Sequence, residues 1–244
     1  MNSSWLRYLR TNKQAKMKLF CFPYAGSGPG VFNPWLQSFD SEIEVVSIHY
    51  PGREARISEP PFTDLDKLVE TLYLHIAPHL DKPFAFFGHS MGAYVAFILS
   101  MYLANKGVTR PEHLFVSGAG APFLVLDDPI HELDSKQFLK AVIRLNGIPK
   151  ECLKEPELIA CCLPALRADF TACERYRFDL HGELDLPVTL LGGTRDPRVS
   201  LSHLDAWSTI ASRGMDKHLF EGDHFFINQY KAKIAKLINQ TLLG

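Results

Sequence analysis

One stretch, residues 84–97, constrains the fold of this chain more than any other. An apolar run, Phe-Ala-Phe-Phe, leads into G-H-S-M-G at 88–92, and a second apolar run follows directly. The pattern G-x-S-x-G between a buried strand and a helix is typical of a sharp turn with the serine, here Ser90, at its apex. Glycine is expected at 88 and 92 because the chain passes too close to itself there for a Cβ atom. An ordinary glycine-rich turn is the alternative.

The rest of the chain alternates in the same way between short apolar runs and segments of helical period. This alternation predicts a mostly parallel α/β sheet with helices on both faces. A chain of 244 residues with 46% hydrophobic residues can build one such core, so we predict a single domain at 17–244. The expected strands are 17–23, 44–50, 84–88, 113–118, 187–193 and 217–222, and the expected helices are 64–79, 91–105, 201–211 and 226–243.

The alternation breaks between about residues 122 and 170, where the sequence indicates helices near 135–145 and 155–170 instead of strands. An insertion between two strands of a regular sheet is typically a lid over the strand ends. Its apolar side chains are candidates for lining a binding site, and packing within the insertion is the alternative. The candidates are Phe123, Leu124, Phe138 and Val142.

The first sixteen residues stand apart, because they carry Arg7, Arg10, Lys13 and Lys16 and no acid. We interpret them as an N-terminal extension that is flexible or forms a short surface helix, with the basic side chains on a solvated face. An organellar transit peptide is the alternative.

Composition excludes several classes of function. The net charge is -1, so nothing global points to nucleic acid or to an anionic membrane surface. No apolar run approaches the ~18 residues that span a bilayer. The five cysteines contain no C-x-x-C pair, which predicts neither a zinc site nor a disulfide framework. We therefore expect a cytoplasmic monomer with free thiols and no metal ion.

The partners of Ser90 follow from the order along the chain. In this type of sheet the acid and then the histidine come after the serine, each just beyond a late strand. Asp196 follows the expected strand at 187–193, and His224 follows the one at 217–222. Both positions lie at the carboxyl edge of a parallel sheet. The other nearby acids precede a strand, lie within a helix or adjoin the histidine: Asp185, Asp205 and Asp223.

These three residue types predict nucleophilic catalysis. His224 Nε2 would accept the Ser90 proton, while Asp196 would hold Nδ1–H and select the tautomer. The backbone N–H of Met91, at the start of the helix, would bind the oxyanion that forms.

A loop with three glycines at 24–30 is expected to supply the second oxyanion donor, the N–H of Ala25. The loop lacks both G-x-G-x-x-G and G-K-[ST], so phosphate binding is not predicted. A flexible turn is the alternative.

Several motifs together resemble one family. They are F-P-Y-A-G at 22–26, Y-P-G-R-E-A-R at 50–56, the 88–92 turn, L-P-A-L-R-A-D-F at 163–170, G-G-T-R-D-P at 192–197 and G-D-H-F-F at 222–226. The chain is similar to the type II thioesterases that accompany non-ribosomal peptide and polyketide synthases. It also resembles the vertebrate enzyme that releases medium-chain fatty acids from fatty acid synthase. The resemblance covers about 17–243, and P-G-R-E and L-R-A-D-F are its most specific parts.

The resemblance implies an α/β-hydrolase fold and a stand-alone hydrolase with no cofactor of its own. Its substrates would be acyl or aminoacyl groups on the phosphopantetheine arm of a carrier protein, removed to regenerate stalled synthases in antibiotic biosynthesis. The resemblance also implies the acid role of Asp196 and the base role of His224. The chain departs from the family at Ala25-Gly26-Ser27-Gly28, where two adjacent glycines are commoner, and this bears on the second oxyanion donor.

Four alternatives stay open from the sequence. They are hydrolysis of free small-molecule esters, release of medium-chain fatty acids, acyl transfer to an acceptor other than water, and a partner-binding protein that keeps the fold without its chemistry.

Overall fold

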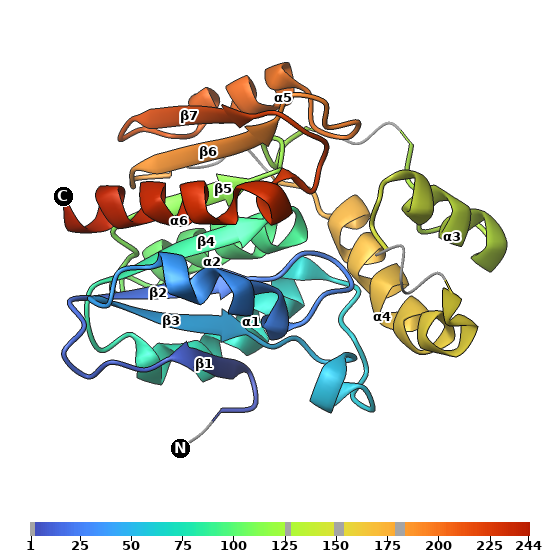
Figure 1. The fold of residues 1–244 in the computed structure, drawn as a ribbon, viewed down its shortest axis with the longest axis horizontal. Coiled ribbons are helices and arrows are strands. Elements are labelled where there is room, and N and C mark those ends of the chain that lie inside the picture. Colours follow the sequence, from blue (N-terminus) through green and yellow to red (C-terminus); the bar gives the residue numbers. More distant parts are fainter. Residues whose placement is uncertain (1–2, 125–127, 149–153, 179–183) are drawn as a thin grey trace.

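The computed structural model describes residues 3–124, 128–148, 154–178 and 184–244. Within these residues one sheet runs in the order β1-β3-β2-β4-β5-β6-β7 (Figure 1). β1 pairs with β3 antiparallel, and the other neighbouring pairs are parallel. The strands are β1 (Leu6–Arg10), β2 (Met17–Phe22), β3 (Ile43–Ile48), β4 (Phe84–His89), β5 (Leu114–Ser117), β6 (Val188–Gly193) and β7 (Met215–Phe220).

Helices cover both faces of the sheet, which explains why β2 to β6 are buried along their whole length. α6 (Phe226–Leu243) and the 3₁₀ segment Pro29–Ser38 pack on one face and lie in front of the sheet in Figure 1. α1 (Leu65–Ile76) and α2 (Met91–Asn105) pack on the other. The short α5 (Leu201–Asp205) follows β6. The predicted α/β-hydrolase architecture, with its mostly parallel sheet, is confirmed.

The N-terminal segment differs from the prediction. Leu6–Arg10 is neither flexible nor a surface helix: it is the edge strand β1, paired with β3. Trp5, only 4% exposed, lies under the guanidinium of Arg56, whose Cζ is 4.5 Å from the ring centroid. Arg10 donates to the backbone carbonyls of Leu36, Phe39, Asp40 and Ile43. The basic side chains that suggested a solvated helical face therefore include one that ties the strand to a neighbouring loop.

In its described residues the insertion contains the α-helices α3 (Ser135–Arg144) and α4 (Pro156–Arg175), which lie beside one end of the sheet in Figure 1. α4 continues past the expected end at residue 170 because its inner face stays buried through Glu174. Phe138, Val142 and Leu166 form a small core between the two helices.

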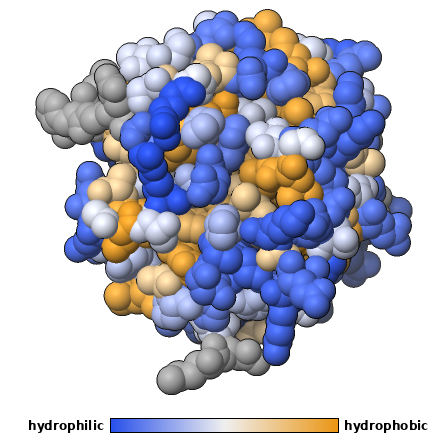
Figure 2. Space-filling view, turned by 90° about the vertical axis from the view of Figure 1, so that its left-hand side faces the viewer, coloured by the Kyte–Doolittle hydropathy of each residue, from blue (hydrophilic) through white to orange (hydrophobic). Residues whose placement is uncertain are grey.

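Figure 2 shows the side of the molecule turned away from α3 and α4. Hydrophilic residues dominate this face, and hydrophobic ones lie in small groups among them. In the part of the chain that the structure describes, no helix is both long and apolar enough to cross a bilayer.

Candidate active site

The turn between β4 and α2 holds Ser90 in a conformation that few serines adopt. Its φ is 54° and its ψ is -120°, in a region that costs an ordinary side chain on the order of 1–3 kcal/mol. The Ser90 N–H donates to the carbonyl oxygen of Ser117 at the end of β5 (2.8 Å), which helps to hold the turn. Strain retained between two well-packed elements is typical of a nucleophile elbow.

The two glycines of this turn are required by contacts with the backbone. A Cβ atom on Gly88 would lie 2.2 Å from the carbonyl oxygen of Gly92. A Cβ atom on Gly92 would lie 2.0 Å from the carbonyl oxygen of Phe22, the last residue of β2. Neither backbone oxygen can move far, so the prediction that no Cβ fits at 88 or 92 is confirmed.

Asp196 and His224 meet at the carboxyl ends of β6 and β7, which are neighbours in the sheet. Asp196 Oδ2 accepts a hydrogen bond from His224 Nδ1 at 2.6 Å, and its side chain is 1% exposed. Asp196 Oδ1 accepts from the N–H groups of Arg198 (2.9 Å) and Val199 (3.1 Å). The carboxylate is thus fixed on one side by backbone donors and on the other by the histidine.

His89, the residue before the nucleophile, has a place that the sequence did not reveal. It is fully buried, and its ring centroid lies 5.0 Å from that of His224. Its Nδ1 is 2.9 Å from Ser117 Oγ. Burial lowers the pKa of His89 well below its usual value, so its ring is neutral. The ring packs against that of His224 and does not compete with it for a proton.

Ser90 and His224 line one pocket together with Met91 and Ala25. Met91 begins α2, and the first N–H groups of a helix have no acceptor within the helix. The helix dipole adds partial positive charge at the same point. The residues chosen for the nucleophile, the base and both oxyanion donors are therefore brought to one cavity. Asp196 stands behind His224.

Comparisons with known proteins identify the family of this chain. Residues 17–242 match the thioesterase domain family. The chain belongs to the thioesterase family. This thioesterase is 34% identical over 240 residues to thioesterase PikA5 of Streptomyces venezuelae, covering 98% of this chain and 85% of that protein. Among solved structures, the type II thioesterase BorB from the borrelidin biosynthetic cluster superposes with a TM-score of 0.90 at 29% identity, covering 98% of both chains.

A further relative is the protein of Brevibacillus parabrevis called linear gramicidin dehydrogenase LgrE, 39% identical over 246 residues, 98% of this chain and 93% of that protein. Its name describes a dehydrogenase, whereas this chain contains no dinucleotide-binding G-x-G-x-x-G motif. The family match indicates a hydrolase of thioesters, and the site geometry fits nucleophilic catalysis by a serine.

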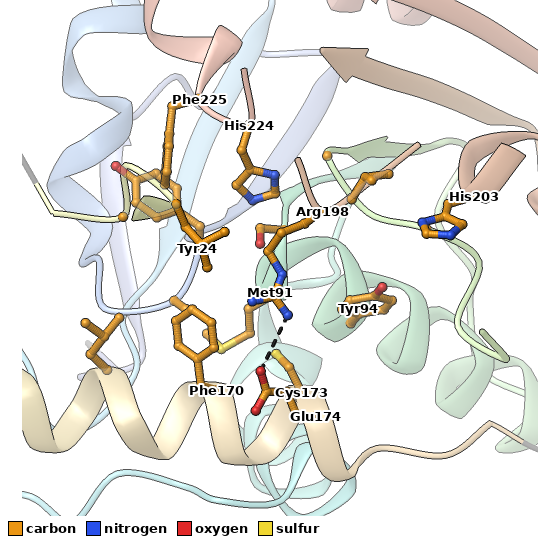
Figure 3. A pocket seen from close by; sticks show the side chains of 18 of the residues that line it. Tyr24, Met91, Tyr94, Phe170, Cys173, Glu174, Arg198, His203, His224 and Phe225 are labelled. Carbon is orange, nitrogen blue, oxygen red and sulfur yellow. Dashed lines mark hydrogen bonds and ion pairs between the residues drawn. The ribbon is translucent and has the colours of Figure 1, made fainter. Parts of the chain in front are cut away.

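The pocket at Ser90 is mostly apolar, and an ion pair between Arg198 and Glu174 contributes to its lining. Figure 3 shows Arg198 crossing the pocket toward Glu174, with 3.4 Å between Nη2 and the carboxylate oxygen. Phe225 and Tyr24 lie next to one another, to the left of His224 in the same view. Burial of Tyr94, which also lines the pocket, raises the pKa of its hydroxyl, so it stays protonated.

The four lid residues chosen from the sequence have different places. Leu124 lines the pocket. Phe123 packs against the main core, and Phe138 and Val142 are fully buried between α3 and α4. None of these three is among the described residues that line the pocket. These three side chains therefore serve packing, which is the alternative that the sequence left open.

Other residues of the insertion line the pocket, chiefly Leu166, Phe170 and Cys173 on α4. Their spacing of i, i+4 and i+7 marks one face of a helix, and this was the signal that could have identified them. The sequence did not say whether that face meets the sheet, α3 or a cavity.

A second pocket adjoins the first. Both are lined by Tyr24, Ala25, Gly147, Leu166 and Phe225. The second continues between the 24–30 loop and the first turns of α4, where Leu158, Ile159 and Leu163 line it. The site is therefore elongated, with Ala25 at the junction of its two parts.

Proposed function

We propose that this thioesterase hydrolyses acyl or aminoacyl thioesters carried on the phosphopantetheine arm of a carrier protein. The observation that carries the proposal is the pair of adjoining pockets. The apolar pocket beside Ser90 suits an acyl group, and the pocket between the 24–30 loop and α4 suits a long, flexible arm. A small free ester would need only the first pocket.

The chemistry follows from the positions of the side chains. Ser90 Oγ attacks the thioester carbonyl while His224 Nε2 accepts its proton, and the N–H groups of Met91 and Ala25 bind the oxyanion. Asp196 stabilises the imidazolium that forms. Because a thiol has a pKa of about 8.5, the thiolate leaves with little help from an acid. The leaving thiolate takes the proton from the His224 imidazolium, so the ring is neutral again. Water then attacks the acyl-Ser90 ester, and His224 accepts its proton and passes it to Ser90 Oγ as the free acid leaves.

The relatives support the biological setting. One is named a thioesterase, and the superposed structure is a type II thioesterase of a biosynthetic cluster. By analogy we propose that the protein removes stalled or wrong acyl groups from a synthase of this kind. It would act as a cytoplasmic monomer that visits the carrier protein and needs no cofactor.

Comparing three substrates with the same acyl group tests the proposal: a loaded carrier protein, a thioester of a short pantetheine mimic, and a short-chain ester. We expect kcat/KM to be highest for the carrier-bound group and lowest for the ester, and Ser90→Ala to abolish all three activities. Much faster turnover of the ester would contradict the carrier-protein assignment and favour the small-ester alternative. Retained turnover in Ser90→Ala would remove Ser90 from the mechanism.

A further inference from the structure

A buried ion pair joins the turn after β3 to the lid helix α4. Arg53 Nη1 and Nη2 donate to the two carboxylate oxygens of Asp169, at 2.6 and 2.9 Å. The two residues are only 5% and 3% exposed. Such a forked pair is directional as well as strong, so it fixes the position of the Asp169 carboxylate.

The same carboxylate holds the oxyanion loop. Asp169 Oδ2 accepts the N–H of Gly26 at 2.7 Å. One turn earlier on α4, Leu166 covers the Cα of Gly26: a Cβ atom there would lie 2.6 Å from Leu166 Cδ1. Gly26 also has a φ of +74°, which favours glycine. A single turn of the lid helix therefore contacts Gly26, the residue next to Ala25, through both Leu166 and Asp169.

The peptide planes on both sides of the Ala25 Cα are held. Before it, the carbonyl oxygen of Tyr24 accepts from Ser27 N (3.1 Å) and Ser27 Oγ (2.6 Å). That carbonyl shares a planar peptide with the Ala25 N–H, which points the opposite way. After it, the Gly26 N–H is fixed by Asp169. With both planes fixed, the direction of the Ala25 N–H is set.

We propose that Asp169 is a positioning residue that aims the Ala25 N–H at the oxyanion, with Arg53 holding the Asp169 carboxylate in place. The lid helix α4 is then part of the catalytic apparatus and not only a cover. This inference rests on the proposed acyl-enzyme chemistry but not on the identity of the acyl carrier.

The test compares two double variants that differ by one hydrogen-bond acceptor. Removing only one partner of a buried ion pair can unfold a protein, whereas replacing both by uncharged groups is often tolerated. Arg53→Met/Asp169→Asn keeps an amide oxygen that can accept the Gly26 N–H. Arg53→Met/Asp169→Leu has nearly the same shape and no acceptor. We expect kcat of the Leu variant to be about 10- to 100-fold below that of the Asn variant, with KM changed less than about 3-fold.

A tetrahedral inhibitor separates positioning from general damage to the pocket. A trifluoromethyl ketone forms an oxyanion when Ser90 adds to it, whereas the matching secondary alcohol binds without adding. Replacing Asn by Leu in the double variant should weaken binding of the ketone in parallel with the loss of kcat/KM. Binding of the alcohol should stay unchanged. Equal rates in the two double variants, or equal weakening of both inhibitors, would overturn the proposal.

A control uses another buried pair, Lys18 and Glu44 (3.6 Å), where Glu44 lies near the amino end of β3. Glu44→Gln should lower thermal stability and leave kcat unchanged. All rates are measured on both a short thioester and a carrier-bound group. A Leu/Asn difference on the short thioester without a preference for the carrier would refute the proposed substrate and keep the positioning role.

Discussion

Replacing Asp196 by asparagine removes a charge from the His224 contact while keeping the shape of a side chain that is 1% exposed. The structure determines how the new amide must lie. The backbone N–H groups of Arg198 and Val199 both donate to Oδ1, so the single oxygen of asparagine is needed there. The NH₂ group then faces His224 Nδ1, now 2.6 Å from Asp196 Oδ2.

An amide donor at Nδ1 moves the histidine proton to Nε2, and this tautomer cannot accept the proton of Ser90. Turning the amide round would leave the two backbone N–H groups without an acceptor, at about 1–3 kcal/mol each. In the variant, the active tautomer with its proton on Nδ1 therefore costs about 2–6 kcal/mol. We expect kcat to fall roughly 10³- to 10⁴-fold, equivalent to about 4–5.5 kcal/mol, with KM little changed.

The assay is steady-state hydrolysis of a short acyl thioester between pH 6 and 9, with ¹⁵N NMR of the histidine ring to identify the tautomer. Asp185→Asn is the matched control, because the ion pairs that Asp185 forms with Arg110 and Arg213 are exposed. It should retain near-normal kcat. A loss below 10-fold in Asp196→Asn, or an unchanged Nδ1–H tautomer, would refute the assignment of Asp196.

Three further predictions concern the fold. Gly92→Ala should unfold the elbow or abolish activity, because its Cβ would lie 2.0 Å from the Phe22 carbonyl oxygen; an unchanged Tm with normal kcat would contradict this. Trp5→Ala should cost about 3–5 kcal/mol in urea unfolding without changing kcat, since Trp5 is buried under Arg56; a loss below about 1 kcal/mol would show that β1 is dispensable. Burial lowers the pKa of His113 from 6.5 to about 4, so the unfolded chain takes up the proton first as the pH falls. About 3 kcal/mol of stability present above pH 6.5 should be lost by pH 4, and His113→Gln should flatten this loss in pH-dependent unfolding.

Features that depend on local pattern were determined by the sequence alone. The apolar runs predicted the buried strands, since a parallel strand covered on both faces has no polar side. The spacing of Gly88, Ser90 and Gly92 predicted the elbow, and the order of strands along the chain placed Asp196 and His224. These inferences needed local patterns, the order of those patterns along the chain, and the rule that parallel strands end at one edge.

Features that depend on which distant segments meet were decided by the tertiary structure. Residues 6–10 form β1 because they pair with the free edge of β3. A basic, weakly apolar segment does not predict this pairing from its sequence. Asp169 reaches Gly26 across 143 positions of the chain, and His89 meets His224 across 135. Periodicity tells which face of α4 is buried, but only the packed structure decides that Leu166 and Phe170 line the cavity while Phe138 and Val142 fill the core between α3 and α4. The physical reason is that hydrophobic burial is non-directional: it specifies that a side chain leaves water, and the geometry of the assembled elements specifies what it touches.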